Sequence, residues 1–332
     1  MRIALDAMGG DHAPQATVAG AVAAARELAI EVLLVGQPGP LEGELSRYDG
    51  AAGVSIVPAS EVVAMDEPPA AAVRGKPDSS IAVAMRLVKD GKAEAFVSAG
   101  NTGACMAAGV LLLGRAPGVE RPALGTVIPA AGGRRTLLVD AGANAENRAP
   151  HLAQFALMGR AYAERVLGIP DPSVGLLSIG EEAAKGNPLV HEAYQLLEAL
   201  PGLRFVGNVE GRDIPRGVAD VVVTDGFTGN VVLKCIEGTA EMLLQELRGA
   251  IRARLPARLG AALALGAFRE LRRKLDYAEY GGAPMLGLRG VVIIGHGRSD
   301  ARAVRNALRA ARDAVDQHIV EAVTDMASGE RA

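Results

Sequence analysis

A chain of 332 residues of which 49% are hydrophobic can bury a large core without disulfide bonds. Its formal net charge of −3 argues against a surface that binds nucleic acid through bulk positive charge, so we expect no nucleic-acid partner. No apolar run reaches about 18 residues and the first residues already form a strand pattern, so we expect neither a membrane-spanning helix nor a signal peptide.

Short apolar stretches alternate with helical patterns along the chain, and six of these stretches run directly into a glycine-rich polar loop. Continuous Val, Ile and Leu runs are typical of strands buried on both faces of a parallel sheet, whose carboxyl ends line a ligand crevice. We therefore expect the six loops to converge on one site. The expected strands are IAL, EAFV, RTLLV, VGLL, DVVV and GVVI, and their loops span 6–11, 98–103, 140–147, 178–187, 224–230 and 294–300.

Helical patterns fill the segments between these strands, and no low-complexity linker divides them. Asp78 is expected to cap one helix, because an aspartate side chain accepts hydrogen bonds from the free N–H groups of a first turn. The fold class predicted is α/β, with a mostly parallel sheet flanked by helices. We expect residues 1–332 to form one two-lobed domain with the active cleft between its lobes. Helices are expected over 15–29, 78–91, 150–168 and 188–200, and further strands over 31–36 and 54–57.

The segment 247–275 departs from this alternation. Apolar residues recur in it about every four positions, past an expected kink at Pro256, and arginines occupy the other faces. We expect an inserted, protruding, basic amphipathic helical hairpin. Such a hairpin either lies on an anionic membrane surface or packs its apolar stripe against a partner subunit, and helical spacing does not distinguish the two. The candidate membrane-facing residues are Leu255, Leu259, Leu263 and Phe268.

The polar loops favour an anionic ligand, most simply a phosphate. Glycine lets the backbone approach a ligand closely, and helix N-termini offer N–H donors and the positive end of a dipole. Lys185 is a lone cation in its loop, and Asn230 is expected near a helix start. Their alternative roles are a surface ion pair for Lys185 and a helix cap for Asn230. The further candidate phosphate-binding or substrate-binding residues are Asp6, Gly9, Gly10, Asp11, Ser98, Asn101, Thr102, Asn144, Glu181, Asn187, Asp225 and His296.

Several common motifs are absent from the sequence. The five histidines never fall in an HxxxH or HExxH spacing, so we expect no metal site. There is no GxSxG elbow, no Walker A sequence and no GxGxxG after the first strand, which argues against a serine hydrolase, a P-loop ATPase and a dinucleotide-binding protein. Cys105 and Cys235 lie far apart in helical patterns and are expected to be reduced, buried thiols.

A specific resemblance covers nearly the whole chain, from Arg2 to about Val323. The segments DAMGGDHAP, SAGNTGA, DAGAN, SIGEE with KGN, GNVEGRD, DGFTGNVVLK, EYGGAPMLGL and HGRSDAR occur in the order typical of the phosphate acyltransferase family of bacterial phospholipid synthesis. The family's fold is similar to that of phosphotransacetylases and of the isocitrate and isopropylmalate dehydrogenases. One departure is Arg298, where a serine is commoner, which adds a cation beside the expected site.

The resemblance implies a function and a set of partners. Family members convert a long-chain acyl–acyl-carrier-protein and inorganic phosphate into acyl phosphate, which a membrane acyltransferase uses to acylate glycerol 3-phosphate. It further implies a homodimer without a cofactor, cytoplasmic and in peripheral contact with an anionic membrane. Phosphate attacks the thioester, so the protein must orient two substrates and supply donors to the tetrahedral oxyanion. Lys185 and Asn230 are the expected donors.

Three alternatives remain open at this point. A phosphotransacetylase would use coenzyme A in place of the carrier protein. A membrane-bound scaffold would position acyl carrier protein without chemistry of its own, although the density of polar loops argues against it. A decarboxylating NAD-dependent dehydrogenase would need a divalent metal held by carboxylates.

Overall fold

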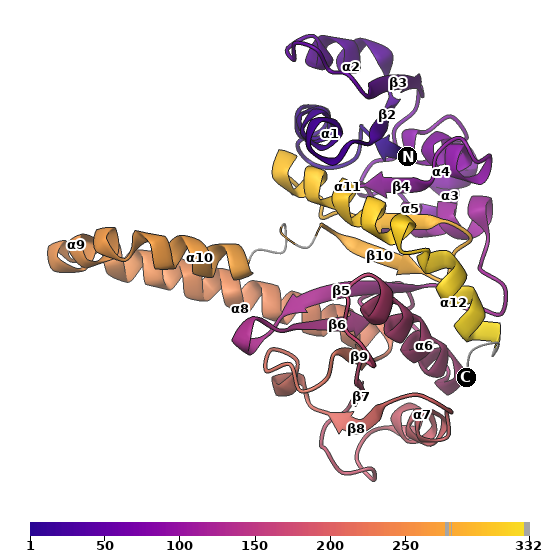
Figure 1. Ribbon diagram of the computed structural model, residues 1–332, viewed down its shortest axis with the longest axis vertical. Coiled ribbons are helices and arrows are strands. Elements are labelled where there is room, and N and C mark those ends of the chain that lie inside the picture. The colour runs from indigo at the N-terminus through magenta and orange to yellow at the C-terminus, as the bar shows by residue number, and fades with distance from the viewer. Residues whose placement is uncertain (276–278, 280, 329–332) are drawn as a thin grey trace.

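One mixed sheet forms the centre of the molecule (Figure 1). The computed structural model describes residues 1–275, 279 and 281–328, and of residues 255, 271–275 and 328 it describes the backbone only. Within these residues the sheet has 11 strands in the order β3-β2-β1-β4-β11-β10-β5-β6-β9-β7-β8. The strands are β1 (Arg2–Asp6), β2 (Glu31–Gly36), β3 (Val54–Pro58), β4 (Ala95–Ser98), β5 (Ala123–Pro129), β6 (Arg135–Val139), β7 (Val174–Leu177), β8 (Phe205–Val209), β9 (Val221–Val223), β10 (Ala283–Leu286) and β11 (Val291–Ile294).

The sheet consists of two parallel halves that run in opposite directions. β3, β2, β1, β4 and β11 are mutually parallel, as are β6, β9, β7 and β8, and the antiparallel pairings of β10 and β5 reverse the direction between them. Ile294, the last residue of β11, pairs with Ala283 of β10. The pairing of β10 with β5, and of β5 with β6, places Ile294 at the same level as Leu138 near the end of β6. The two halves are therefore staggered, and their carboxyl ends meet at one level in the middle of the sheet.

Helices cover both faces of the sheet, as the sequence predicts. Strand residues alternate between two buried clusters, because successive side chains point to opposite faces. α1, α6, α7, α11 and α12 pack on one face, and α4, α5 and the base of α8 pack on the other. The helices are α1 (Gln15–Leu28), α2 (Pro38–Leu45), α3 (Pro69–Gly75), α4 (Ser80–Lys89), α5 (Thr102–Ala108), α6 (Ala149–Arg165), α7 (Pro188–Glu198), α8 (Gly226–Arg252), α9 (Leu255–Leu263), α10 (Leu265–Leu275), α11 (Ala301–Asp316) and α12 (Ile319–Ser328), with a π turn at Gly109–Leu113 and 3₁₀ turns at Ala131–Gly133 and Gly211–Asp213.

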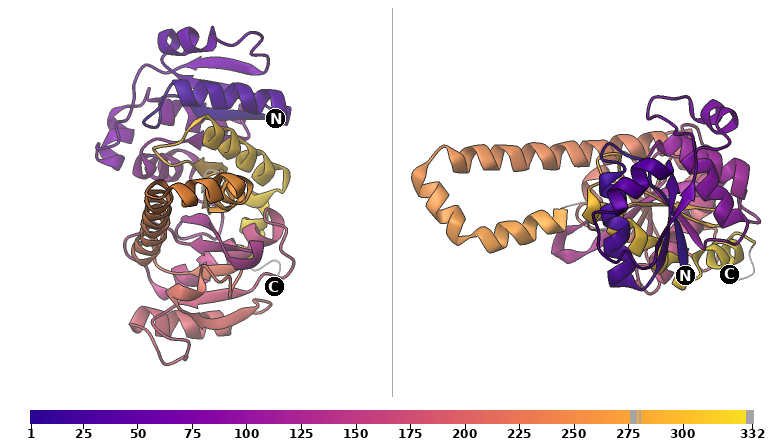
Figure 2. Two further views of the ribbon diagram at one scale, coloured as in Figure 1. Left: turned by 90° about the vertical axis from the view of Figure 1, so that its left-hand side faces the viewer. Right: turned by 90° about the horizontal axis from the view of Figure 1, so that it is seen from above.

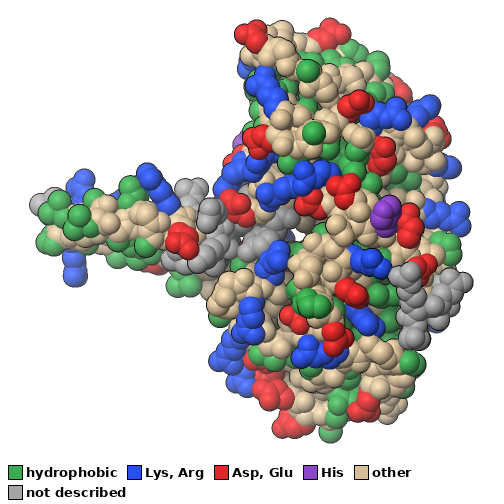
Figure 3. Space-filling model, in the orientation of Figure 1, with side chains coloured by type: hydrophobic (Ala, Val, Ile, Leu, Met, Phe, Trp, Pro, Cys, Tyr) green, Lys and Arg blue, Asp and Glu red, His purple; other side chains and the backbone are tan. Residues whose placement is uncertain are grey.

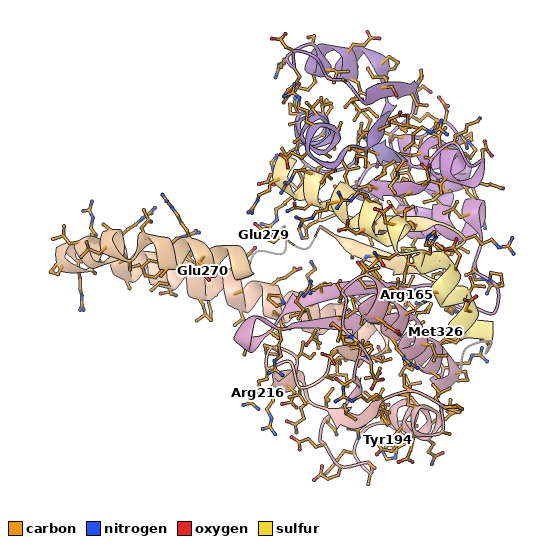
Figure 4. The ribbon with its side chains drawn as sticks, in the orientation of Figure 1. Arg165, Tyr194, Arg216, Glu270, Glu279 and Met326 are labelled. Atoms are coloured by element: carbon orange, nitrogen blue, oxygen red, sulfur yellow. The ribbon has the colours of Figure 1, made fainter. Side chains whose placement is uncertain are left out.

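α8, α9 and α10 form an arm that projects from the body (Figure 2). α8 runs outward, and α9 and α10 return toward the body. The helix is interrupted between Arg252 and Leu255. Pro256 lies in the first turn of α9, because proline is tolerated there but not in a helix interior. Glu279 lies where the chain re-enters the body (Figure 4) and holds it there by a 2.6 Å ion pair with Arg302. Within the described residues, no helix combines the length and apolarity needed to cross a bilayer.

Two local predictions are corrected by the structure. Ser79, not Asp78, caps α4 by accepting a hydrogen bond from the Ala82 N–H group. The Asp78 carboxylate instead accepts two hydrogen bonds from Ser60, which secure the preceding loop. Cys105 is buried in α5 as expected, but Cys235 is exposed, because α8 leaves the body soon after its first turns.

Candidate active site

A cavity of about 610 Å³ lies on the face of β5 and β10, between α5 and α8. Its floor is apolar and includes Leu124 of β5 and Met285 of β10. It lies where the carboxyl ends of the two half-sheets meet, so loops from both halves reach it. The walls and rim are formed by Asp11, Met65, Thr102, Gly103, Met106, Ala141, Gly142, Ala143, Asn230, Leu233, Lys234, Glu237, Gly295, His296, Gly297 and Arg298.

Five of the six predicted loops contribute to this cavity. Of the predicted site residues, Asp11, Thr102, Asn230 and His296 line it. Asn230 lies in the second turn of α8, and the loop after β6 closes against it: a Cβ built on Gly142 would lie 3.2 Å from the Asn230 Cβ. The loop 178–187 contributes none of the described lining residues.

Asp6 and Ser98 lie beneath the cavity and join two of its loops. Both side chains are buried at the ends of β1 and β4, and the Ser98 hydroxyl donates a 2.6 Å hydrogen bond to the Asp6 carboxylate. Burial raises the pKa of Asp6, although hydrogen bonds from serine hydroxyls and backbone N–H groups oppose the shift. Gly9 packs on this carboxylate, and Gly10 adopts a φ of +100° that favours glycine. These residues position the loops and do not line the cavity.

Asn101 and Asp225 cap the two helices that wall the cavity. The Asn101 side chain accepts a hydrogen bond from Ala104 N–H at 3.0 Å, and the Asp225 carboxylate accepts one from Thr228 N–H at 2.9 Å. The Asn101 amide also donates to three backbone carbonyls of the loop at residues 64–67. Helix capping, the alternative role of Asn230, is thus performed in α8 by Asp225, and Asn101 caps α5.

Asp140 organises the loop after β6 and is not among the predicted site residues. Its buried carboxylate accepts hydrogen bonds from the N–H groups of Leu124, Gly142, Ala143 and Asn144 and from the Asn144 amide. Burial nevertheless raises the pKa of Asp140, because desolvation outweighs these donors. Asn144 is held inside this network and donates to the Pro122 carbonyl as well. The role of Asp140 could have been predicted from its position at the start of the DAGAN segment, directly after a buried strand.

Glu181, Lys185 and Asn187 lie on the loop after β7, outside the cavity. Lys185 is exposed, and Glu181 is 3.6 Å from Arg212 in an exposed ion pair. Asn187 caps α7 by accepting a hydrogen bond from Val190 N–H at 2.9 Å. Because β7 is parallel to β9, this loop leaves the same end of the half-sheet as the segment that begins α8.

Two cations not among the predicted binding residues stand in the cavity wall. Lys234 follows Asn230 by one helical turn, and its Nζ lies 2.8 Å from Oε2 of Glu237. The Arg298 Nη2 lies 3.4 Å from Oε1 of Glu241. Burial, followed by the charge of Lys234, lowers the pKa of His296, so the imidazole is neutral at pH 7. The cavity thus combines two cations, a neutral imidazole and a carboxamide with an apolar floor. No cluster of His, Cys, Asp and Glu suited to a metal ion occurs in the described part of the chain.

Comparison with known proteins identifies the family. Residues 1–322 match the model of a family described as fatty acid synthesis protein. The chain is 54% identical over 331 residues to the phosphate acyltransferase of Heliobacterium modesticaldum, covering 99% of this chain and 98% of that protein. It is 51% identical over 333 residues to the phosphate acyltransferase of Moorella thermoacetica, covering 100% and 98%. The chain belongs to the phosphate acyltransferase family. It is therefore an acyltransferase enzyme, as the sequence motifs indicate.

Solved structures show how widely the fold of this phosphate acyltransferase family is shared. A phosphotransacetylase from Streptococcus pyogenes superposes with a TM-score of 0.65 at 18% identity, covering 95% of this chain and 94% of that one. A branched-chain phosphotransacylase from Enterococcus faecalis V583 gives 0.59 at 15% identity, covering 95% and 99%. At these identities the comparison establishes the fold alone, and it confirms the predicted similarity to phosphotransacetylases.

Proposed function

We propose that this enzyme transfers the acyl group of a long-chain acyl–acyl-carrier-protein to inorganic phosphate, releasing acyl phosphate and the free carrier thiol. Membership of the phosphate acyltransferase family supports phosphate as the acceptor. The observation that carries the proposal is the cavity itself, in which a wall that bears Lys234 and Arg298 adjoins an apolar floor. Such a cavity can hold a phosphate and an acyl carbon side by side.

The phosphate is placed at the wall formed by α8 and the loop after β11. Lys234 and Arg298 supply positive charge, and the Asn230 amide can donate one hydrogen bond. The neutral imidazole of His296 can donate another from one ring nitrogen. The ion pairs of Lys234 with Glu237 and of Arg298 with Glu241 are exposed, so an incoming dianion can exchange for either carboxylate at small cost.

The chemistry then needs orientation and an oxyanion site. A phosphate oxygen attacks the thioester carbon, the carbonyl oxygen becomes an oxyanion, and collapse breaks the C–S bond. The electron pair leaves with sulfur, and the thiolate takes a proton from solvent. Since a substantial fraction of inorganic phosphate is dianionic near neutral pH, no dedicated base is required. Asn230 is placed to donate to the oxyanion, because Gly142 and the loop after β6 hold its side chain at the cavity.

Two lysines compete for the cationic role in catalysis. The sequence motif favours Lys185, whereas the geometry of the chain favours Lys234, which lies in the cavity one turn from Asn230. We assign the role to Lys234 and retain Lys185 as the alternative. Alanine variants of the two residues separate these assignments.

Mass spectrometry of the purified enzyme tests the reaction. Palmitoyl–acyl-carrier-protein and heavy-oxygen-labelled phosphate should yield labelled acyl phosphate together with free carrier protein. Activity with acetyl coenzyme A but not with the carrier thioester would replace the proposal with a phosphotransacetylase. Binding of the carrier protein without any product would favour a scaffold.

The product and the arm suggest where the enzyme works. Acyl phosphate is an activated acyl donor, which a membrane glycerol-3-phosphate acyltransferase would consume. Leu259 and Leu263 near the outer end of the arm are 71% and 92% exposed, and the arginines Arg254 and Arg258 are exposed beside them (Figure 3). Apolar side chains flanked by cations suit the headgroup region of an anionic membrane. Phe268 is half-buried, and the Leu255 side chain lies outside the described residues. We therefore propose a cytoplasmic enzyme in peripheral membrane contact.

A homodimer would cover a second apolar surface. Met242 and Leu243 on α8 are 54% and 59% exposed, closer to the body than the tip. Exposed apolar side chains next to each other on one helix are typical of a protein interface. Light scattering on the purified enzyme should give twice the chain mass.

A further inference from the structure

The cavity continues into a second space under α8, which we call the α8 trough. The trough has a volume of about 680 Å³ and shares part of its lining with the cavity, including Thr126, Leu233 and His296. It runs between α8, the outer part of β5 and the start of α11. A molecule held at the cavity wall can therefore extend into the trough without crossing solvent-exposed backbone.

Apolar side chains line the trough on the side of α8. Leu233, Ile236, Ala240 and Leu244 line it from α8, and their spacing of three or four residues puts them on one face of the helix. Ile128 of β5 lies opposite them, with Pro129 and Pro215 farther out. The four α8 side chains are only half-buried in the single chain. They thus form an apolar surface that a further apolar group could cover.

Charged side chains also line the trough. Arg298, from the loop after β11, reaches Glu241 of α8 at 3.4 Å, so that this ion pair bridges the two sides. Glu237 lines both the cavity and the trough and pairs with Lys234. A ligand in the trough would thus contact the apolar side chains of α8 and β5 and lie beside charged groups. The other polar lining residues are Thr126, Gln245, Arg248, His296, Asp300 and Arg302.

We propose that the α8 trough holds the acyl chain of the substrate, with the thioester carbon beside Asn230 and the methyl end near Leu244; this rests on the proposed function. Asn230 and Leu244 are separated by about 21 Å of helix at 1.5 Å per residue. An extended chain advances about 1.2 Å per bond, so the roughly 15 carbon–carbon bonds of a palmitoyl group span ~18 Å. The trough matches the length of a long acyl chain.

The position of the trough also separates this proposal from acyl binding at the tip of the arm. The exposed leucines of α9 lie beyond the end of α8, whereas the trough starts at the cavity wall. An acyl chain seated on α9 could not at the same time place its thioester carbon beside Asn230. The trough therefore determines chain-length preference, and the tip does not.

Substitution of two residues of α8 tests the proposal. Leu244→Trp should fill the outer end of the trough, and Thr239→Trp, on an exposed position of the same helix that does not line it, is the control. In the wild-type enzyme each methylene that enters the trough should raise kcat/KM by roughly two- to fourfold. Leu244→Trp should lower kcat/KM for palmitoyl–carrier protein at least tenfold and leave octanoyl–carrier protein within about twofold.

The octanoyl measurement also reports whether the variant is folded and whether the proposed reaction occurs. Equal losses for both chain lengths in folded Leu244→Trp, or the same selective loss in Thr239→Trp, would overturn the placement of the acyl chain in the trough. Absence of acyl phosphate from wild type with any thioester would instead refute the proposed function. Chain placement then still has an independent readout: palmitic acid with a photoreactive diazirine at its methyl end should label peptides from residues 236–248 or 126–129. Labelling confined to 256–270 would refute the placement.

Discussion

Ser98 donates a 2.6 Å hydrogen bond to Asp6, and this bond joins the last residue of β4 to the last residue of β1. The same hydroxyl accepts from Gly100 N–H at 2.9 Å, so the first turn of the following loop is fixed from the same point. Two loops that carry Asp11 and Thr102 into the cavity thus depend on one buried polar pair.

Removal of the Ser98 hydroxyl should destabilise the protein. Ser98→Ala leaves the buried Asp6 carboxylate with one donor fewer, and an unsatisfied buried group costs about 1–3 kcal/mol. Urea denaturation followed by circular dichroism measures this loss. Ser46→Ala is the matched control, because that exposed hydroxyl donates only to a carbonyl in its own helix, and it should change the free energy of unfolding by less than about 0.5 kcal/mol. Equal stability of the two variants would contradict the role of the pair.

Asp6 should also make stability depend on pH. Burial raises its pKa above the ordinary value of 3.8, so the folded protein holds this proton more tightly than the unfolded chain does. The stabilising contribution is complete below 3.8 and is lost as pH rises through the raised pKa of the folded state. Asp6→Asn removes this titration. Thermal midpoints measured across that range should fall with pH more steeply in wild type than in Asp6→Asn, and parallel profiles would refute the argument.

The catalytic assignments predict different losses of activity. Asn230→Ala and Lys234→Ala should each lower kcat by roughly 10²-fold, because each removes a donor to developing or bound negative charge. Lys185→Ala should have a smaller effect, since Lys185 lies outside the cavity. Steady-state kinetics with palmitoyl–carrier protein and phosphate measure all three. A loss in Lys185→Ala that exceeds the loss in Lys234→Ala would return the cationic role to Lys185.

Two glycines of α8 should respond oppositely to alanine. A methyl group on Gly229 would collide with the Asp140 carbonyl oxygen, so α8 must shift away from the loop after β6, at a cost of about 1–3 kcal/mol. Gly238 has open space around it, and alanine there should stabilise the helix by up to about 1 kcal/mol. Denaturation and kinetics of the two variants give the comparison. Because Asn230 follows Gly229 directly, Gly229→Ala should also lower kcat; unchanged activity would show that the close packing is not needed.

A charge at the tip of the arm should weaken membrane binding. Leu263→Asp introduces a negative charge at a side chain that is 92% exposed, and an anionic surface repels it. Flotation with vesicles containing anionic lipid should fall severalfold relative to wild type. Leu196→Asp, on α7 of the body, is the control and should float like wild type. Undiminished flotation of Leu263→Asp would favour the alternative that the arm meets a partner subunit.

Local sequence patterns predict the strands that are buried on both faces and the helices between them. β9 reads as an uninterrupted Val run, and α7 begins at Pro188 behind an Asn187 cap, because these elements follow from side chains close in sequence. Four predicted loop residues line the cavity for the same reason, because each lies on the segment that follows the end of a buried strand. Lys234 could have joined them, since its spacing from Asn230 puts both on one helical face.

Long-range pairing could not be predicted in this way. β10 is a four-residue strand that contains Pro284 and lies between glycines, so it carries no strong strand pattern. Yet its two antiparallel pairings join β11 to β5, and their register contributes to the stagger that brings the two sets of loops together. The contact between Ser98 and Asp6 joins residues 92 positions apart, and neither residue signals the other.

α8 is a continuous helix of 27 residues, about 40 Å long at 1.5 Å per residue. Its second and third turns carry Asn230 and Lys234, and its far end meets α9 in the arm. Because α8 is continuous, the same helix that extends into the arm carries Asn230 and Lys234. One rigid element thus joins the wall of the cavity to the outer part of the arm.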